Sequence, residues 1–215
     1  MPERVVSLWF PRLPSDRVLR ARPTDTPFAL VLHQQNTDRL YCLNRAAEAQ
    51  GLHRGMGYSD AHAFCPDLQS CPADLPADRR FLLMLARWAK RYCPWVGLDG
   101  ADGLVMNITG SAHLFGGEEA MLSNMRLGLA RAGINPRFGL ADTRGAAWAL
   151  AHFDQGTAAS KETRARLATL PVAALRLTDK TSIALQRLGV RRIADLLKLP
   201  RATVTRRFGM DAMLR

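Results

Sequence analysis

Short apolar runs alternate with amphipathic helical stripes over the first three quarters of the chain. Residues 4–10, 28–33 and 137–140 predict buried strands, because each is a short segment rich in apolar residues. Residues 95–98 and 104–108 flank the sequence DGADG and predict a β-hairpin. This alternation predicts an α/β or α+β fold in which helices cover a mixed sheet.

The longest helical stripe repeats at i, i+4, i+7 and i+11. It predicts a helix that starts near Arg79 and ends before Pro94. Its apolar members are Phe81, Leu85, Trp88 and Tyr92. Further helices are predicted at residues 44–52, 59–64 and 143–153 and in a segment that starts at residue 118. The stretch from Pro72 to Asp78, with its two prolines, is interpreted as a linker.

The pattern changes near residue 158. Residues 161–215 are rich in Leu, Arg and Ala and contain helix-ending residues but no strand signal. We therefore expect a domain boundary near residue 158, followed by small helices joined by tight turns.

The chain is strongly basic. Thirty Lys and Arg residues stand against 19 Asp and Glu residues, which gives a formal net charge of +11. Such an excess favours a polyanionic partner, since each neutralised phosphate releases condensed counterions. Charge alone does not distinguish DNA from RNA or from an anionic membrane, and a merely basic surface would give the same composition.

The cysteine pattern argues against zinc and disulfides. The four cysteines are Cys42, Cys65, Cys71 and Cys93. They form no C-x-x-C pair, so free thiols in a reducing compartment are expected. No apolar stretch approaches the roughly 20 residues that span a bilayer. These features predict a cytoplasmic protein without a membrane segment.

Five short motifs follow one another along the chain. They are Asn44–Met56 (NRAAEAQGLHRGM), Cys65–Leu68 (CPDL), Gly100–Gly110 (GADGLVMNITG), Gly139–Ala151 (GLADTRGAAWALA), and Leu170–Val172 together with Leu188–Leu196. In order and in spacing they resemble the motifs of the Y-family translesion DNA polymerases. The resemblance extends over nearly the whole chain.

The resemblance implies a three-part architecture. Residues 1–18 and 75–157 would form the palm, an α/β domain, and residues 19–74 a small fingers insertion. Residues 158–215 would form a helical thumb with a degenerate helix–hairpin–helix. The little-finger domain of the family is expected to be absent from this chain, which would then be an N-terminal fragment.

The carboxylates of the family are mostly missing. Two-metal phosphoryl transfer needs clustered carboxylates that hold paired Mg²⁺ ions. The resemblance places Leu8 at the first metal-binding aspartate. It matches Asp102 to the aspartate of the palm hairpin, and Gly103 to the glutamate beside it. One carboxylate of three is retained, and a single aspartate cannot hold two such cations.

The residues that clamp the nucleotide triphosphate are also altered. The Tyr and Arg that reach the triphosphate in the family correspond to Arg45 and Glu48. Glu48 would place a negative charge where a triphosphate requires a guanidinium. A cation is retained at Arg144, which corresponds to the lysine of the family's N-K pair.

This combination resembles the catalytically silent branch of the family, whose members act as adaptors in bacterial damage-induced mutagenesis. The resemblance implies weak binding to primer–template DNA. It also implies three protein partners: an error-prone replicative-type polymerase, a small RecA-like helper and the sliding clamp. No cofactor is expected. The candidate phosphate-contacting residues in the thumb are Arg191, Arg192, Arg201, Arg206 and Arg207.

Two alternatives stay open. The chain could be a weak polymerase that uses Mg²⁺ with Asp102, Asp99 and a third acid such as Asp142, although turn formation alone explains both aspartates of the DGADG hairpin. It could also be a protein-interaction module that binds no DNA. Metal-dependent nucleotide incorporation would identify the weak polymerase. Absence of salt-dependent DNA binding would identify the interaction module, whereas a non-catalytic scaffold would bind DNA without incorporation.

Overall fold

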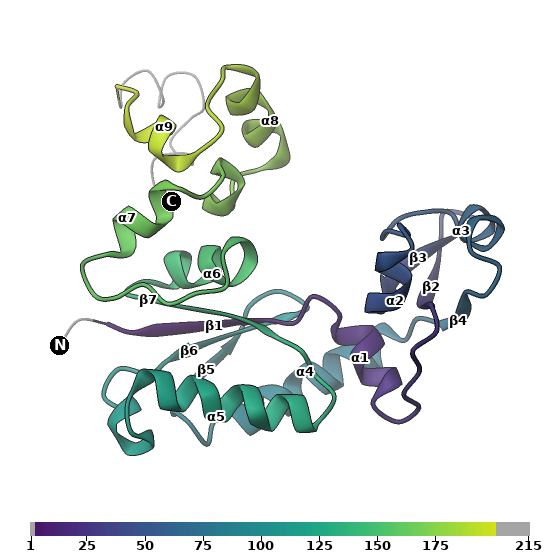
Figure 1. The fold of residues 1–215 in the computed structure, drawn as a ribbon, viewed down its shortest axis with the longest axis horizontal. Coiled ribbons are helices and arrows are strands. Elements are labelled where there is room, and N and C mark those ends of the chain that lie inside the picture. Colours follow the sequence, from purple (N-terminus) through teal and green to yellow (C-terminus); the bar gives the residue numbers. More distant parts are fainter. Residues whose placement is uncertain (1–2, 201–215) are drawn as a thin grey trace.

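The structure is a computed structural model that describes residues 3–200, which form two sheets with flanking helices (Figure 1). The strands are β1 (Val5–Trp9), β2 (Phe28–Gln34), β3 (Thr37–Leu43), β4 (Gln69–Pro72), β5 (Trp95–Leu98), β6 (Gly103–Asn107) and β7 (Arg137–Ala141). The helices are α1 (Leu13–Leu19), α2 (Arg45–Ala49), α3 (Tyr58–Phe64), α4 (Leu75–Ala89), α5 (Glu118–Arg131), α6 (Arg144–Phe153), α7 (Thr163–Ala168), α8 (Asp179–Arg187) and α9 (Ile193–Leu197), with 3₁₀ turns η1 (Ala112–Phe115) and η2 (Val172–Leu175). The predicted strands and the predicted β5–β6 hairpin are confirmed.

The larger sheet has the strand order β5-β6-β1-β7. We expected it to be mixed, but each pair of neighbouring strands is antiparallel. The reason is that β6 and β7, which α5 connects, run in the same direction without touching. The strand β1 lies between them and runs the opposite way, with Ser7 opposite Val105 on β6 and Gly139 on β7.

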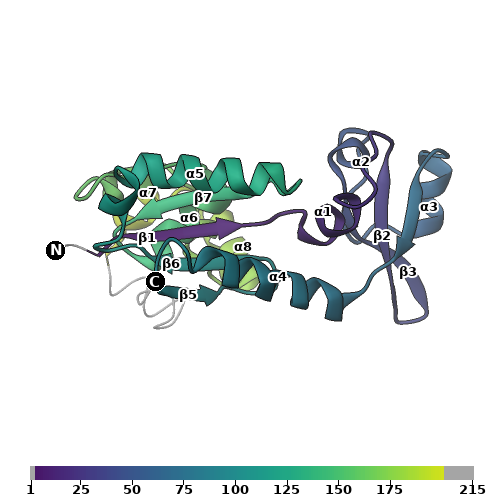
Figure 2. The ribbon, with the colours of Figure 1, turned by 90° about the horizontal axis from the view of Figure 1, so that it is seen from below.

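Helices cover both faces of this sheet (Figure 2). On one face, Val6 and Leu8 of β1 belong to a core that includes apolar residues of α4 and α5. On the other face, Val5 packs with the alanine-rich side of α6. Alternate residues of β1 therefore point into two separate cores.

The smaller sheet has the order β3-β2-β4 and lies within residues 28–72, the segment expected to hold the insertion. Here the pairing is mixed, because β2 runs antiparallel to β3 and parallel to β4. Gln35 and Asn36, both with positive φ, form the tight turn between β2 and β3. The sequence did not predict β3 or β4. In β3, the charged pair Asp38–Arg39 precedes the apolar residues 40–43, which leaves an apolar segment of only four residues.

The linker expected at residues 72–78 is wrong. The helix α4 already begins at Leu75, because the Asp74 side chain accepts a hydrogen bond from the Ala77 N–H at 2.9 Å and caps the helix. Pro76 lies in the first turn, where its missing N–H leaves no helical hydrogen bond unmade. The helix α1 was missed for a similar reason, since Pro14 occupies its first turn.

The segment after residue 158 is helical in the described range. Leu170, Ala174 and Ile193 share a core with Ala146 and Leu150 of α6, so the start of this segment packs on the palm-like part. None of the described helices is both long enough and apolar enough to cross a membrane.

Candidate functional site

The β5–β6 hairpin brings an aspartate against the end of β1. The backbone of Asp99 donates to the carbonyl of Gly103 at 2.9 Å and closes the turn. Next to it, the Asp102 carbonyl accepts from the Phe10 N–H at 2.8 Å. The indole Nε1 of Trp9 then donates to Oδ2 of Asp102 at 3.0 Å. The carboxylate that matches the family's metal ligand is thus held by a tryptophan.

The neighbouring aspartate, Asp99, is neutralised by two arginines. Its side chain is 4% exposed. Nη2 of Arg144 and Nη2 of Arg176 each donate to Oδ1 at 2.9 Å, and Nη1 of Arg176 donates to Oδ2 at 3.3 Å. Burial alone would raise the pKa of Asp99, but the hydrogen bonds from Arg176 and Arg144 outweigh it and lower the pKa. Asp99 is therefore a charged group whose partners are already in place.

An aromatic stack fills the space beside these two aspartates. The ring of His152 lies between those of Trp9 and Trp148, with centroid distances of 4.2 Å and 4.0 Å. The guanidinium of Arg137 lies over Trp9 at 5.4 Å, and that of Arg176 lies over Trp148 at 4.5 Å. We call these five residues the Trp–His stack.

The central histidine of the Trp–His stack is neutral at physiological pH. Burial is the largest effect on His152 and lowers its pKa. Its Nδ1 lies 2.9 Å from the Trp148 carbonyl, which can only accept, so Nδ1 carries the proton. The positive charge of the stack therefore resides on its two outer arginines, Arg137 and Arg176.

The strand geometry corrects the position assigned to Leu8. Leu8 is fully buried in the core with α4 and α5, on the sheet face that points away from Asp102. Alternation along β1 places Ser7 and Trp9 on the face that carries the site. Of these side chains of β1, Trp9 reaches Asp102, whereas Leu8 does not. The alternation of the strand contained this signal.

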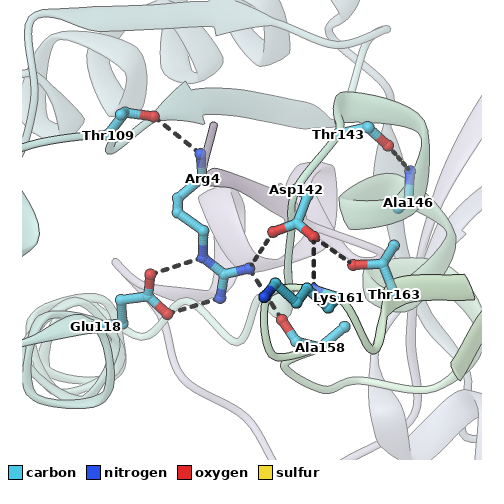
Figure 3. Close-up of polar contacts among 9 residues, drawn as sticks. All are labelled: Arg4, Thr109, Glu118, Asp142, Thr143, Ala146, Ala158, Lys161 and Thr163. Atoms are coloured by element: carbon cyan, nitrogen blue, oxygen red, sulfur yellow. Dashed lines mark hydrogen bonds and ion pairs between the residues drawn. The ribbon is translucent and has the colours of Figure 1, made fainter. Parts of the chain in front are cut away.

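Asp142, the suggested third acid, lies elsewhere. It follows β7 at the end where Val5 pairs with Ala141, whereas Asp102 lies at the Trp9 end of β1. The four residue steps from Val5 to Trp9 separate the two ends by roughly 13 Å. Asp142 instead accepts from Nη1 of Arg4 at 2.9 Å (Figure 3). It does not join Asp102 and Asp99 in one cluster.

These residues do not fit a pair of Mg²⁺ ions. Hard divalent cations need several oxygen ligands, and two-metal sites share carboxylates between the ions. Asp102 lies beside Trp9 and Gly103, and Asp99 already pairs with two guanidinium groups. Over residues 3–200, no three His, Cys, Asp or Glu side chains lie close enough together to hold a metal ion.

A side chain at position 103 would collide with the hairpin. A Cβ built on Gly103 would lie 2.5 Å from the carbonyl oxygen of Asp99. We expect Gly103→Ala to destabilise the fold by about 2 kcal/mol, because backbone rather than a flexible side chain must move. The glutamate of the family would meet the same obstacle.

Urea unfolding followed by circular dichroism checks this expectation. Gly97→Ala in the partner strand β5 is the matched control, since its Cβ would meet only Val105 Cγ1 at 3.4 Å. Equal unfolding midpoints for the two variants would show that the hairpin accommodates a side chain at position 103.

The residues matched to the triphosphate clamp do not form one. Oε2 of Glu48 accepts from Nη1 of Arg12 at 2.6 Å, which joins α2 to the start of α1. Arg45, the first residue of α2, is exposed. Arg144 is turned to Asp99, although 57% of its side chain remains exposed.

Only part of the arginine group proposed for DNA contact can be located. Arg191 and Arg192 are exposed between α8 and α9, where Arg192 precedes the first residue of α9. Arg201, Arg206 and Arg207 lie outside the described residues. Trp9, His152 and Arg176, which build the site together with Trp148, were not singled out from the sequence.

Comparison with known sequences shows a family match. The profile described as the impB/mucB/samB family matches residues 16–152. Two curated relatives, both named Protein ImuB and from two strains of Caulobacter vibrioides (NA1000 / CB15N and ATCC 19089 / CIP 103742 / CB 15), are 49% identical over 167 residues. The match covers 77% of this chain and 36% of each relative, so the chain spans about a third of their length.

Comparison with solved structures shows the fold. The insertion ternary complex of Dbh DNA polymerase has a TM-score of 0.86 at 15% identity, and DinB from Sulfolobus solfataricus has a TM-score of 0.78 at 16% identity. Each match covers 98% of this chain and 65% of that structure. The chain therefore has the fold of the corresponding part of a Y-family polymerase.

Proposed function

Because the chain belongs to the impB/mucB/samB family, we propose that it is a non-catalytic Y-family homologue that binds primer–template DNA as a scaffold. Its role would be in DNA damage tolerance and induced mutagenesis, where it would bring an error-prone polymerase to the DNA. The chain has the fold of the palm and adjacent domains of a polymerase. A loss of catalytic activity would therefore come from the side chains of the site.

The observation that carries the proposal is the Trp–His stack beside Asp102. A polymerase needs open carboxylates at this point, where metal ions neutralise the phosphates of the incoming nucleotide. Here Trp9 holds Asp102, and Arg144 and Arg176 hold Asp99. Asp99 is paired with cations and Asp102 accepts a hydrogen bond from within the protein, so neither carboxylate needs a metal for the palm to fold.

DNA binding is supported by charge. The net charge of +11 and the exposed pair Arg191 and Arg192 suit contacts with phosphates from the thumb-like segment. The protein partners follow from the resemblance alone: an error-prone replicative-type polymerase, a RecA-like helper and the sliding clamp. The described cysteines are all free thiols, which suits a cytoplasmic protein.

Primer extension tests the proposal. We expect no nucleotide incorporation above background on undamaged or abasic templates, with Mg²⁺ or with Mn²⁺, while an active Y-family polymerase extends the same primers. On the same primer–template, affinity should fall at least about tenfold from about 0.05 to about 0.2 M salt, since bound phosphates release counterions.

The rival reading, a weak polymerase, predicts incorporation that requires a divalent metal and disappears in Asp102→Ala. That result would overturn the non-catalytic proposal. Absence of salt-sensitive DNA binding, with no incorporation, would instead favour a protein-interaction module.

A further inference from the structure

The outer side of α4 carries a group of basic and apolar residues that lies outside the core of the fold. We call it the α4 basic face. Its members, all exposed, are Arg79, Arg80, Leu83, Met84, Arg87, Lys90 and Arg91. At 100° per residue these positions cover one continuous arc of about 140°, opposite the stripe of Phe81, Leu82, Leu85 and Ala89 that packs on the sheet.

The cations of the α4 basic face have no acidic partners. None of the ion pairs found among residues 3–200 involves any of its five Lys and Arg side chains. The one acidic residue within α4, Asp78, is buried and pairs with Arg17 at 2.7 Å. The face is therefore uniformly positive, and Arg91 also makes a local contact with Trp88, whose ring lies 5.4 Å from its guanidinium and whose carbonyl accepts from its Nε at 3.1 Å.

The face also lies away from the site already described. Figure 2 views the molecule from the side of α4 and α5, with the large sheet between these helices and α6. The helix α6, which carries Trp148 and His152 of the stack, and the thumb-like helices α7, α8 and α9 lie beyond that sheet (Figure 1). A ligand on α4 would leave the opposite side of the sheet free.

We propose that the α4 basic face docks an acidic, partly apolar segment of a partner protein. Leu83 lies within the basic arc and Met84 at its edge, both near the middle of the helix along its length, and they are 39% and 44% exposed. Phosphates gain nothing from such groups, whereas protein interfaces combine an apolar centre with a polar rim. Four of the five cations are arginine, which protein interfaces favour over lysine.

The positive charge of the α4 basic face disfavours two other binding partners. The stretch from Arg201 to Arg215 has four arginines and one aspartate, so its own charge is repelled from α4. A second copy of the chain brings a net charge of +11 and is disfavoured on the same ground. An acidic partner remains, and this inference rests on the proposed adaptor role for its biological meaning.

A pair of labelled peptides tests the docking surface. The first is a short glutamate-rich helical peptide with two leucines one turn apart, and the second has serines in place of those leucines. Fluorescence anisotropy should show that this chain binds the leucine peptide at least about tenfold more tightly than the serine peptide, because Leu83 and Met84 receive the leucines.

Two variants and a matched control locate the binding. Arg80→Glu with Arg87→Glu should weaken the leucine peptide about tenfold or more, and Leu83→Ser with Met84→Ser should abolish the preference for it. The control, Arg22→Glu with Arg131→Glu, changes the net charge equally at two exposed positions outside α4. It should weaken binding no more than about threefold, by general charge alone.

The same variants separate this inference from the proposed function. Binding to primer–template DNA should be the same in the Arg80/Arg87 variant and in the control. A selective loss of DNA binding would assign the face to nucleic acid and overturn the proposal. So would equal affinity for the two peptides, equal weakening by the control, or a dimer in sedimentation that the Arg80/Arg87 variant abolishes. Failure of the DNA-scaffold proposal would leave the peptide results unchanged.

Discussion

Replacing Gly139 with alanine is expected to destabilise the protein by more than about 3 kcal/mol. A Cβ at this position would lie 2.0 Å from the carbonyl oxygen of Ala147 and 2.5 Å from the backbone nitrogen of Ala151. Both atoms belong to the backbone of α6, which lies directly on β7. The clash can be relieved only by moving the helix away from the sheet, and urea unfolding measures the cost.

The same helix supplies the control for this substitution. Gly145, in the first turn of α6, has open space where its Cβ would be, so Gly145→Ala should stabilise by up to about 1 kcal/mol. An unfolding midpoint for Gly139→Ala close to that of the wild type would show that α6 is not in contact with β7 at this point.

The close approach at Gly139 also matters for the site. The helix α6 carries Trp148 and His152, which stack with Trp9 of β1. Strand and helix must lie this close for the three rings to meet. We therefore expect Gly139→Ala to disturb the near-ultraviolet circular dichroism of the tryptophans even where some of the fold survives.

Local periodicity accounts for what the sequence predicted well. The apolar run of β1, the stripe of α4 and the helical segment of α6 are short-range patterns, and the structure confirms them. The strand β3 was missed because a charged pair lies near its start, and the helix α1 was missed because a proline lies in its first turn. Mixed pairing was predicted for the large sheet, which is antiparallel, and it occurs instead in the small sheet. Local patterns do not show that β1 lies between β6 and β7.

The site itself was only partly predictable. Asp102 and Gly103 were located by motif, but their surroundings depend on residues far apart in the chain, such as Trp9, His152 and Arg176. No spacing rule connects these positions. The loss of carboxylates could be seen in the sequence, whereas the aromatic and cationic groups that occupy their place could be seen only in three dimensions.

Arg4 is expected to be the most sensitive charged residue of the fold. Its side chain, 11% exposed, donates to both oxygens of Glu118 at 2.7 Å and to Asp142 at 2.9 Å (Figure 3). It also donates to the carbonyl of Ala158 at 3.0 Å. One guanidinium thus joins β1, the start of α5, the β7–α6 turn and the beginning of the thumb-like segment.

We expect Arg4→Met to lower the free energy of unfolding by about 3 kcal/mol at neutral pH. Methionine keeps the volume but leaves two carboxylates without their cation, and removing one partner of a buried pair costs several kcal/mol. The expected loss of unfolding free energy lies at the low end of the range for buried ion pairs, because Glu118 and Asp142 keep 36% and 24% of their side chains exposed. Urea unfolding provides the measurement.

The effect should depend on pH. Burial would raise the pKa of Asp142, but hydrogen bonds from Arg4, the Lys161 N–H and the Thr163 hydroxyl lower it below its usual range. A carboxylate with a lowered pKa stabilises the fold above its unfolded value near about 4, and this contribution is lost as the pH falls through the folded value. The difference between wild type and Arg4→Met should therefore be constant from about pH 5 to pH 7 and should shrink below about pH 4.

Arg12→Met is the matched control, because it removes one cation from a single, more exposed pair. Arg12 and Glu48 are 24% and 41% exposed, and such pairs contribute at most about 1 kcal/mol. If Arg4→Met were no more destabilising than Arg12→Met, or if its effect did not change in acid, the Arg4 network would not hold these segments together. The larger, acid-sensitive loss that we expect would show that the palm-like sheet and the thumb-like segment depend on one arginine at the first strand.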